Sequence, residues 1–434
     1  MKRVLIITYY WPPSGGSGVQ RWLKMSKYLP ENGWQPVIYT AEDAEYPVED
    51  KSLEKDVTPE AEVIRRPIAE PYTFYKKFLG IKKGEKVKAG FINEGVKKSS
   101  WKENLSVWLR GNFFIPDARC WWVKPSVKYL SNYLKDHPVD AIISTGPPHS
   151  MHLIAKALHQ RFNIPWVADF RDPWTEVFYF DSLKLTKGSI RKHKKLENQV
   201  LTEADKVVAV SWHEAADFEA LGAKNVEVIT NGYDEECIGD KTQSIDNEHF
   251  TVSYTGVLLP NESFVIWDAF KELCEENVDF AKALKINLIG HIDASVKKYI
   301  ADKGLDSKVK NIEYMQHSQV LEYQRQSDIL LLLIPRAKKA DCILTGKLFE
   351  YLVSGRPVLA IGPAEGDASK VLSETRCGIT ADYDDKQKMK ATILEYFNKR
   401  NENQSVGCDK EEVAKYSRKN LTKDYVRVLN DITR

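Results

Sequence analysis

A cation and a carboxylate, Lys347 and Glu350, lie three positions apart and would share one face of a helix. The apolar runs 329–334 and 358–361 on either side of them are short and rich in branched residues, which predicts two buried strands. A cation and a carboxylate at the open end of a parallel sheet suit a ligand that carries phosphate and hydroxyl groups. A surface ion pair is the alternative that the spacing leaves open.

The helix between these two strands has recognisable ends. Thr345 is a suitable N-cap residue, Gly355 a suitable C-terminal stop, and Pro357 cannot continue a helix. The unit is therefore strand, loop, helix and strand, and a right-handed crossover is expected. Ligands of such sheets bind beyond the carboxyl ends of the strands, where the N-terminus of the helix points.

A glycine-containing loop follows the first predicted strand, at residues 4–8. Gly15 and Gly16 lie in this loop, just before a helical pattern at residues 19–29. Glycines let backbone N–H groups approach a phosphate at the start of a helix, and tight turn geometry is the alternative. The match to G-x-G-x-x-G is poor and no Walker lysine follows, so we do not expect a dinucleotide site.

Polar residues also follow later predicted strands, at 140–144 and 166–169. His149 comes after the first of these strands, and Arg171 and Asp172 come after the second. His149 is a candidate catalytic or ligand-contacting residue, with a structural role as the alternative. Arg171 and Asp172 could line the same side of the site or form a local ion pair.

The length and composition limit the function classes. A chain of 434 residues is too long for one ordinary core, so two domains are expected. The net charge of +2 gives no case for nucleic-acid binding. The six cysteines show no C-x-x-C spacing, which favours reduced thiols, no metal site and a cytoplasmic protein. The short N-terminal apolar run indicates a strand and not a signal peptide, and no run could span a membrane.

Residues 71–125 interrupt the alternation of strands and helices. The stretch from Pro71 to Arg110 contains ten lysines and arginines but only three glutamates, and aromatic residues are interleaved with them. Such a segment suits an anionic membrane surface or a polyanionic partner. The alternative is a solvated insertion whose aromatic residues pack on their own domain, since Trp121 and Trp122 are typical of a core.

Two α/β domains of similar size follow from the pattern of strands. Residues 1–235 form the first and residues 250–410 the second, with a polar linker at 236–249. The amphipathic helix expected at 411–434 would pack back on the first domain. The remaining strands are expected at residues 37–39, 63–64, 206–210, 226–230, 250–254, 286–289, 312–314 and 377–380.

The sequence resembles glycosyltransferase family 4, and its two domains resemble the GT-B fold, in which two Rossmann-like domains with parallel sheets face a central cleft. The resemblance covers nearly the whole chain, from Val4 to about Cys377. Six stretches carry it, at residues 7–16, 142–150, 168–174, 228–234, 254–256 and 346–358.

The resemblance implies roles for several residues. Of the family's two glutamates, the second matches Glu350, which would bind the ribose of a nucleotide, and the first would fall at Cys342. The family's basic pair would fall within 257–262, where this chain has no cation. Lys347 and Arg336 are then the expected counter-charges for a diphosphate. Gly346 and Gly256 belong to the same donor-binding motifs.

The resemblance also implies the reaction. It is that of a retaining enzyme that transfers a sugar from a nucleotide-sugar to a glycan or lipid-linked acceptor, without a metal or other cofactor. Cell-surface polysaccharide or glycolipid synthesis at the inner face of the membrane is the implied setting. An epimerase or hydrolase of the same fold, or an inactive sugar-binding relative, is the alternative.

Overall fold

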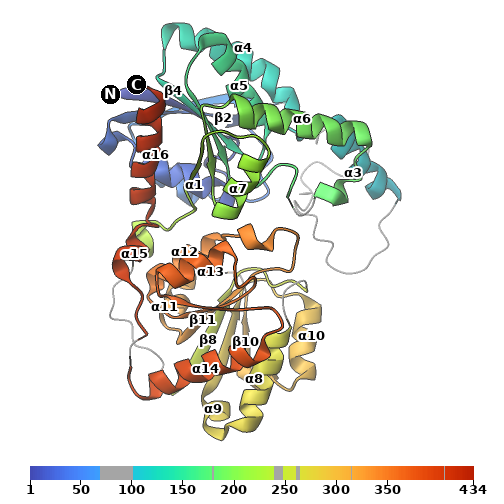
Figure 1. Ribbon diagram of the computed structural model, residues 1–434, viewed down its shortest axis with the longest axis vertical. Coiled ribbons are helices and arrows are strands. Elements are labelled where there is room, and N and C mark those ends of the chain that lie inside the picture. Colours follow the sequence, from blue (N-terminus) through green and yellow to red (C-terminus); the bar gives the residue numbers. More distant parts are fainter. Residues whose placement is uncertain (69–100, 178–179, 239–247, 261–263, 314, 405) are drawn as a thin grey trace. The chain divides into compact units, whose positions relative to one another are not determined.

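The computed structural model describes residues 1–434 except 69–100, 178–179, 239–247, 261–263, 314 and 405. The chain forms two compact units (Figure 1). Unit 1 comprises Met1–Thr230 and Leu421–Arg434, and unit 2 comprises Asn231–Asn420. The C-terminal segment therefore belongs to the same unit as the N-terminus.

Unit 1 contains a seven-stranded parallel sheet with the order β3-β2-β1-β4-β5-β6-β7. Its strands are β1 (Lys2–Ile7), β2 (Trp34–Glu42), β3 (Glu62–Pro67), β4 (Ala141–Gly146), β5 (Trp166–Phe170), β6 (Lys206–Ala209) and β7 (Val226–Val228). Its helices are α1 (Ser17–Ser26), α3 (Trp101–Phe113), α4 (Cys120–Asp136), α5 (Ser150–Phe162), α6 (Lys187–Glu203), α7 (Trp212–Ala220) and most of α16 (Arg418–Ile432).

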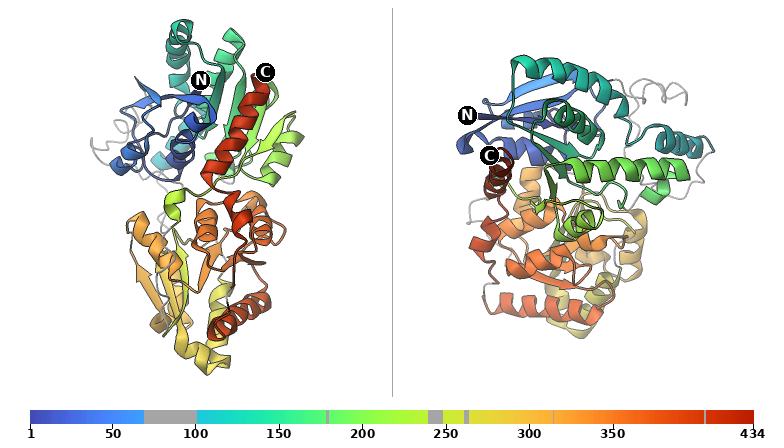
Figure 2. Two further views of the ribbon diagram at one scale, coloured as in Figure 1. Left: turned by 90° about the vertical axis from the view of Figure 1, so that its left-hand side faces the viewer. Right: turned by 45° about the horizontal axis from the view of Figure 1, so that its top comes forward.

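Both faces of this sheet are covered, which explains why its central strands are continuous apolar runs. In β1, Leu5 and Ile7 pack with residues of α4, α5, α6 and α7 on one face. Val4 and Ile6 point to the other face, where α1 and α16 pack. Figure 2 shows α16 lying along unit 1. The helix at the end of the chain thus completes the core of the first unit.

Unit 2 contains a six-stranded parallel sheet with the order β10-β9-β8-β11-β12-β13. Its strands are β8 (Phe250–Thr255), β9 (Leu284–Ile289), β10 (Val309–Ile312), β11 (Ile329–Leu333), β12 (Val358–Ile361) and β13 (Gly378–Ala381). Its helices are α8 (Val265–Glu276), α9 (Val278–Ala283), α10 (Ala294–Asp302), α11 (His317–Arg325), α12 (Gly346–Ser354), α13 (Asp367–Glu374), α14 (Lys386–Asn401) and α15 (Lys410–Ala414).

The predicted α/β class with two parallel sheets is confirmed. Helix α12 begins after Thr345 and ends at Gly355, which has a φ of 71° that favours glycine. The strand predicted at 312–314 lies instead at β10, Val309–Ile312. This strand forms an edge of the sheet. Because its Lys310 and Asn311 are exposed, it lacks the continuous apolar run that marks the central strands.

Three expectations need correction or fall outside the described residues. Trp122 is buried as expected, but Trp121 is 49% exposed and is not part of the core. Cys377 and Cys408 form a disulfide, with 4.4 Å between their Cα atoms, so the prediction of reduced thiols is wrong for this pair. Most of the basic segment, residues 71–100, lies outside the described residues.

Candidate functional site

Lys347 lies on the first turn of α12 and reaches the carboxyl end of β8. Its Nζ is 3.2 Å from the Tyr254 hydroxyl oxygen and 4.5 Å from the centroid of that ring. A Cβ atom added to Gly256 would lie 3.1 Å from Nζ, and Gly256 also has a φ of 125°. The positive φ makes any other residue strained at 256, and the absent side chain also leaves room for the lysine.

Glu350 lies one turn further along α12 and is oriented by α11. Its Oε1 is 3.0 Å from His317 Nε2, and its Oε2 accepts a hydrogen bond from Gln324 Nε2 at 3.4 Å. The Glu350 side chain is 26% exposed. The carboxylate is thus held in one orientation while it remains accessible to a ligand.

Tyr351 and two glycines fix the strand ends beside these residues. The Tyr351 hydroxyl accepts the backbone N–H of Thr255 at 3.1 Å, which ties α12 to the end of β8. At the end of β9, Gly290 has a φ of 118°, and a Cβ atom there would lie 2.3 Å from the Gly256 carbonyl oxygen. The ends of β8 and β9 can approach this closely because position 290 is glycine.

Arg336 and Gly346 lie at other positions of unit 2. The Arg336 guanidinium is paired with Asp384 and lies 4.6 Å from the centroid of the Tyr383 ring. Its charge is therefore already compensated in this structure. Gly346 is the exposed first residue of α12. The N-terminus of a nine-residue helix carries partial positive charge and suits an anion.

His149 lies in unit 1, at the position that precedes α5. Its ring is only 7% exposed and stacks parallel to the Trp174 ring at 4.7 Å between centroids. Burial, followed by the nearby His152, Arg171 and His193, holds the pKa of His149 well below its usual value, so the imidazole is neutral. Its Nδ1 has no hydrogen-bond partner among the described residues.

The Arg171 guanidinium holds two loops together. Its Nη1 donates to the Gly18 carbonyl at 2.6 Å, and its Nε donates to the Gly146 carbonyl at 3.4 Å. Its Nη2 donates to the Pro147 carbonyl. These contacts join the first turn of α1 to the loop that leads to His149. Asp172, the next residue, is exposed.

Gly146 has a steric reason to be glycine. A Cβ atom there would lie 2.5 Å from His152 Nε2 and 3.0 Å from His149 Nδ1. His152 is fully buried, its Nδ1 is 2.8 Å from Ser144 Oγ, and burial lowers its pKa to about 3. Two neutral imidazoles therefore pack against the end of β4.

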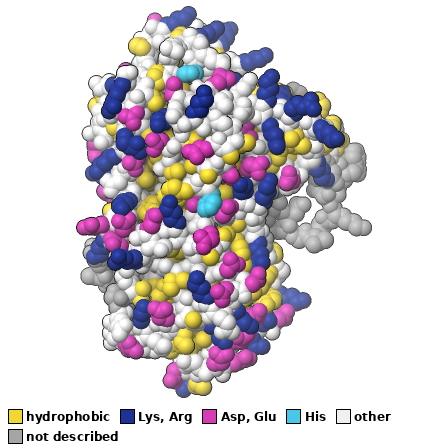
Figure 3. All heavy atoms as spheres, in the orientation of Figure 1, with side chains coloured by type: hydrophobic (Ala, Val, Ile, Leu, Met, Phe, Trp, Pro, Cys, Tyr) yellow, Lys and Arg dark blue, Asp and Glu magenta, His cyan; other side chains and the backbone are white. Residues whose placement is uncertain are grey.

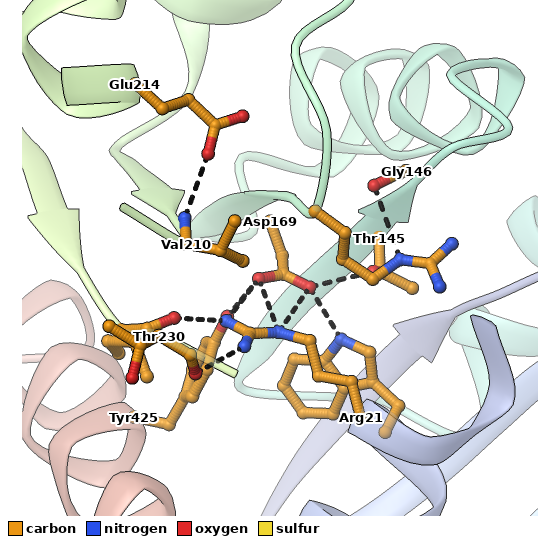
Figure 4. Close-up of polar contacts among 11 residues, drawn as sticks. Arg21, Thr145, Gly146, Asp169, Val210, Glu214, Thr230 and Tyr425 are labelled. Atoms are coloured by element: carbon orange, nitrogen blue, oxygen red, sulfur yellow. Dashed lines mark hydrogen bonds and ion pairs between the residues drawn. The ribbon is translucent and has the colours of Figure 1, made fainter. Parts of the chain in front are cut away.

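Asp169, at the end of β5, is the centre of a buried polar network (Figure 4). Its oxygens accept hydrogen bonds from Thr145 Oγ1 at 2.7 Å, from Trp22 Nε1 at 2.8 Å and from the Tyr425 hydroxyl. Arg21 Nη2 lies 3.0 Å from Asp169 Oδ1. Burial alone would raise the pKa of Asp169, but the charge of Arg21 and these hydrogen bonds keep it below its usual value.

Glu214 lies close to this network in Figure 4, and its pKa is shifted in the opposite direction to that of Asp169. Its Oε2 accepts the Val210 N–H at 3.1 Å, and the side chain is buried. Burial raises the pKa of Glu214 well above its usual value, which favours the neutral acid. Among the residues that the structure describes, Glu214 forms no ion pair, whereas Asp169 is paired with Arg21.

Gly15 and Gly16 shape the loop before α1. The Gly15 N–H donates to the Val48 carbonyl at 2.8 Å, and a Cβ atom at Gly15 would meet Val48 and Asp50 at 3.1 Å. Gly16 has a φ of 80°. The Gly15 N–H is engaged within the protein, which favours the turn alternative over a phosphate cradle at this residue.

Solved structures with this fold include several enzymes of sugar transfer. Sucrose-phosphate synthase from Thermosynechococcus elongatus is 13% identical, with 99% of each chain covered and a TM-score of 0.64. A variant of TarM from S. aureus is 12% identical, with 99% of this chain and 100% of that chain covered and a TM-score of 0.60. WaaG is 12% identical, with 98% and 99% covered and a TM-score of 0.56. These similarities show the GT-B fold.

A family match adds the activity class. Residues 94–236 match the sequence model described as Glycosyltransferase Family 4. The chain is a glycosyltransferase. The matched segment contains β4, β5 and the strand ends that carry His149, Arg171 and Asp172. No curated protein matches the chain.

The structure of this glycosyltransferase groups some of the predicted site residues and separates others. Lys347 and Gly256 meet at the end of β8, whereas Gly346 lies at the exposed start of α12 and Glu350 lies one turn further along that helix. His149 and Arg171 are joined through the loop at 146–149. Among the described residues, no three His, Cys, Asp or Glu side chains are grouped so that they could hold a metal ion.

Several further residues of this glycosyltransferase orient the predicted ones and were not predicted to have a role. In unit 2 these are Tyr254, His317 and Gln324. In unit 1, Trp174 stacks on His149 and donates through Nε1 to His193 Nδ1 at 3.0 Å. The only signal for Trp174 was its place in the stretch after β5, and the only signal for Tyr254 was its place in the stretch 254–256. Nothing in the spacing indicated His317 and Gln324.

Proposed function

We propose that this glycosyltransferase moves a sugar from a nucleotide-sugar to a glycan or lipid-linked acceptor with retention at the anomeric carbon. Unit 2 takes the donor: Glu350 binds the ribose hydroxyls, and Lys347 with the N-terminus of α12 binds the diphosphate. The observation that carries this proposal is the accessible Glu350 carboxylate, which His317 and Gln324 orient on the same helix as Lys347.

The charges of unit 2 suit the departure of a nucleoside diphosphate. Negative charge grows on the β-phosphate as the sugar leaves, and a fixed cation and a helix N-terminus stabilise that charge. Lys347 is positioned by Tyr254 before the ligand arrives, so little reorganisation is needed. The acceptor oxygen attacks from the face of the leaving group, and its proton passes to the phosphate. The reaction needs no metal or other cofactor.

Unit 1 takes the acceptor in this proposal. The neutral imidazole of His149 can accept or donate one hydrogen bond to a sugar hydroxyl, and Trp174 holds the ring in place. Among the neighbours, the TarM variant was solved with UDP, and WaaG is involved in lipopolysaccharide biosynthesis. We therefore place the reaction in cell-surface polysaccharide or glycolipid assembly at the inner face of the membrane.

Thermal-shift screening against UDP-, GDP- and ADP-sugars tests the donor site. A nucleotide at 100 times its dissociation constant should add about 2.7 kcal/mol to the free energy of unfolding. Glu350→Ala and Lys347→Ala should remove this stabilisation. Glu322→Ala and Lys298→Ala, at exposed positions of unit 2, are the matched controls and should keep it. Wild-type stabilisation in both site variants would disprove the assignment.

Product analysis without an acceptor tests the reaction type. A glycosyltransferase leaves the donor largely intact under these conditions, whereas an epimerase or hydrolase converts it. Complete conversion of the nucleotide-sugar in the absence of any acceptor would therefore replace the proposed reaction with one of those two.

A further inference from the structure

Helix α6 carries a strongly basic face. Lys187, Arg191, Lys194 and Lys195 follow the spacing i, i+4, i+7 and i+8, so they share one side of the helix, and all four are exposed. The opposite side carries the buried residues Ser189, His193, Glu197, Val200 and Leu201. The helix therefore has one face in the core of unit 1 and one strongly basic face in solvent.

No acidic residue interrupts the basic face. The sequence from Lys187 to Lys195 contains five cations and no carboxylate, and the next acid, Glu197, is buried. Lys187, Arg191, Lys194 and Lys195 form no ion pair with any residue that the structure describes. Figure 3 shows lysine and arginine side chains gathered over this part of unit 1. In a chain with a net charge of +2, this concentration is local and not a general property.

Exposed aromatic side chains lie at the N-terminal end of the same helix. Phe113 is 65% exposed, and Trp108, which contacts it at 5.9 Å between ring centroids, is 36% exposed. Asn112 fixes this part of α3 beside α6, because its Oδ1 accepts the Thr186 N–H at 2.7 Å. Trp121, at the start of α4, is exposed as well, and the residue before it, Cys120, lies within electrostatic reach of Lys192 on α6.

We propose that this surface, defined by Lys187, Arg191, Lys194 and Lys195 with Trp108, Phe113 and Trp121, docks on an anionic lipid membrane. Cations attract acidic headgroups, and tryptophan and phenylalanine favour the boundary between headgroups and acyl chains. A soluble polyanion would also need the cations, but only a lipid surface offers an apolar layer that the exposed rings can enter. The combination therefore favours a lipid surface. Within the described residues, no helix is long and apolar enough to cross a bilayer.

The inner face of α6 connects this surface to the acceptor side of the proposed function. His193 accepts a hydrogen bond from Trp174, whose ring stacks on His149. Glu197 accepts the N–H of Thr175 at 3.0 Å. The helix that faces the membrane thus also supports the loop beside His149. The inference rests on the proposed function at this point, and it narrows the acceptor to one that is anchored in lipid.

Vesicle flotation tests the docking surface on the full chain. The protein should float with vesicles of phosphatidylcholine and phosphatidylglycerol. With vesicles of phosphatidylcholine alone, it should remain in the bottom fraction. Changing Lys187, Arg191, Lys194 and Lys195 together to Gln should lower the vesicle-bound fraction by about tenfold or more. The matched control changes Lys282, Lys297, Lys298 and Lys388, four exposed lysines of unit 2, to Gln and should bind as the wild type does. Circular dichroism confirms that each variant is folded.

The aromatic residues separate a membrane from a soluble polyanion. The double variant Phe113→Ser with Trp121→Ser should lose binding at raised salt, where screening weakens the contribution of the cations. Val278→Ser, at a position of unit 2 that is as exposed as Phe113, is its control. Competition by heparin together with unchanged vesicle binding of the aromatic variant would overturn the proposal in favour of a polyanionic partner. Equal recovery with and without anionic lipid would also overturn it.

The proposal of the docking surface and the proposal of the donor site can be disproved independently of each other. Flotation is measured without any nucleotide, and the donor site is measured by the nucleotide-induced thermal shift of the Glu350 and Lys347 variants. A chain that binds nucleotide but does not float keeps the proposed function and disproves the docking surface.

Discussion

Arg21 and Asp169 form an ion pair in the interior of unit 1, with 3.0 Å between Nη2 and Oδ1 and at most 3% of either side chain exposed. Arg21 also donates to the carbonyls of Ile229 and Thr230 at 2.7 and 2.8 Å. Thr230 is the last residue of the long segment of this unit, and Tyr425 on α16 bonds to both members of the pair. One buried pair therefore connects α1, β5, the end of the long segment and the returning C-terminal helix.

Removing one member of this pair should destabilise the protein strongly. Arg21→Met leaves the Asp169 carboxylate buried without its counter-charge, which we expect to cost about 3–5 kcal/mol of unfolding free energy. Urea denaturation followed by circular dichroism measures this change. Lys271→Met removes one member of an exposed pair with Glu275 and should cost less than about 1 kcal/mol. Similar losses in the two variants would contradict the central role of the buried pair.

The Tyr425 hydroxyl should contribute separately to the attachment of α16. Tyr425→Phe keeps the ring, which packs against Trp22 at 4.9 Å between centroids, but removes a buried hydrogen bond to a charged group. We expect a loss of about 1.5–3 kcal/mol in the same assay. Tyr299→Phe, which removes a bond to the partly exposed Asp268, should lose less. A Tyr425 variant as stable as the wild type would show that packing alone holds the helix.

The strands of this protein could be predicted from the sequence, but its buried pair could not. Apolar runs such as those of β4 and β11 mark strands that are covered on both faces, and these were found. Arg21 interrupts no such run and lies next to the apolar residues of an amphipathic helix. Its partner Asp169 is 148 positions away, and Tyr425 is 404 positions away. Spacing along the chain cannot reveal contacts at that separation.

The same limit applies to the donor site. Lys347 and Glu350 were predicted because they share one helix, for which spacing is informative. The structure gives them different neighbours, Tyr254 from β8 and His317 from α11. These neighbours come from elements that are adjacent only in the folded sheet. The disulfide between Cys377 and Cys408, 31 positions apart, escaped prediction for the same reason.

Arg171 should act as a positioning residue that no lysine can replace. Its three nitrogens reach three carbonyls, those of Gly18, Gly146 and Pro147, whereas the single ammonium group of lysine cannot match this fork. Arg171→Lys should displace the loop before His149 and lower kcat by about tenfold or more, while the donor dissociation constant stays unchanged.

Steady-state kinetics with a nucleotide-binding titration separates these two effects. Arg161→Lys is the matched control, since Arg161 Nη1 makes one hydrogen bond, to Ser131 Oγ at 2.8 Å. Unchanged kcat in the Arg171 variant, or an equal decrease in the control, would contradict the positioning role.

Gly290→Ala should damage the donor site through the backbone. The added methyl would lie 2.3 Å from the Gly256 carbonyl oxygen, and the φ of 118° at position 290 is unfavourable for alanine. We expect the β8 end to move away from Lys347 and the nucleotide dissociation constant to rise, with a stability loss of about 1–3 kcal/mol. Gly304→Ala also imposes a positive φ, of 73°, but meets nothing within 4 Å. It should lose some stability and still bind nucleotide as the wild type does.

His193 should make the stability of unit 1 depend on pH. Burial lowers the pKa of His193 to about 4, against 6.5 for an unperturbed histidine. Between these two values the unfolded chain binds a proton that the folded chain does not, so the free energy of unfolding falls as the pH decreases from about 6.5 towards 4. At pH 5 this histidine should cost about 1–2 kcal/mol relative to pH 7.

His193→Gln removes the titrating group and leaves an amide oxygen that can accept the Trp174 N–H. The variant should therefore lose less stability than the wild type when the pH is lowered from 7 to 5. The difference between the two losses is the contribution of His193, because the other titrating groups are present in both proteins. Urea denaturation at the two pH values measures it, with His137→Gln, at an exposed position, as the control for the loss of one histidine. Parallel pH profiles for wild type and His193→Gln would contradict the assignment, because a histidine that is neutral when folded must release its proton during folding in this range.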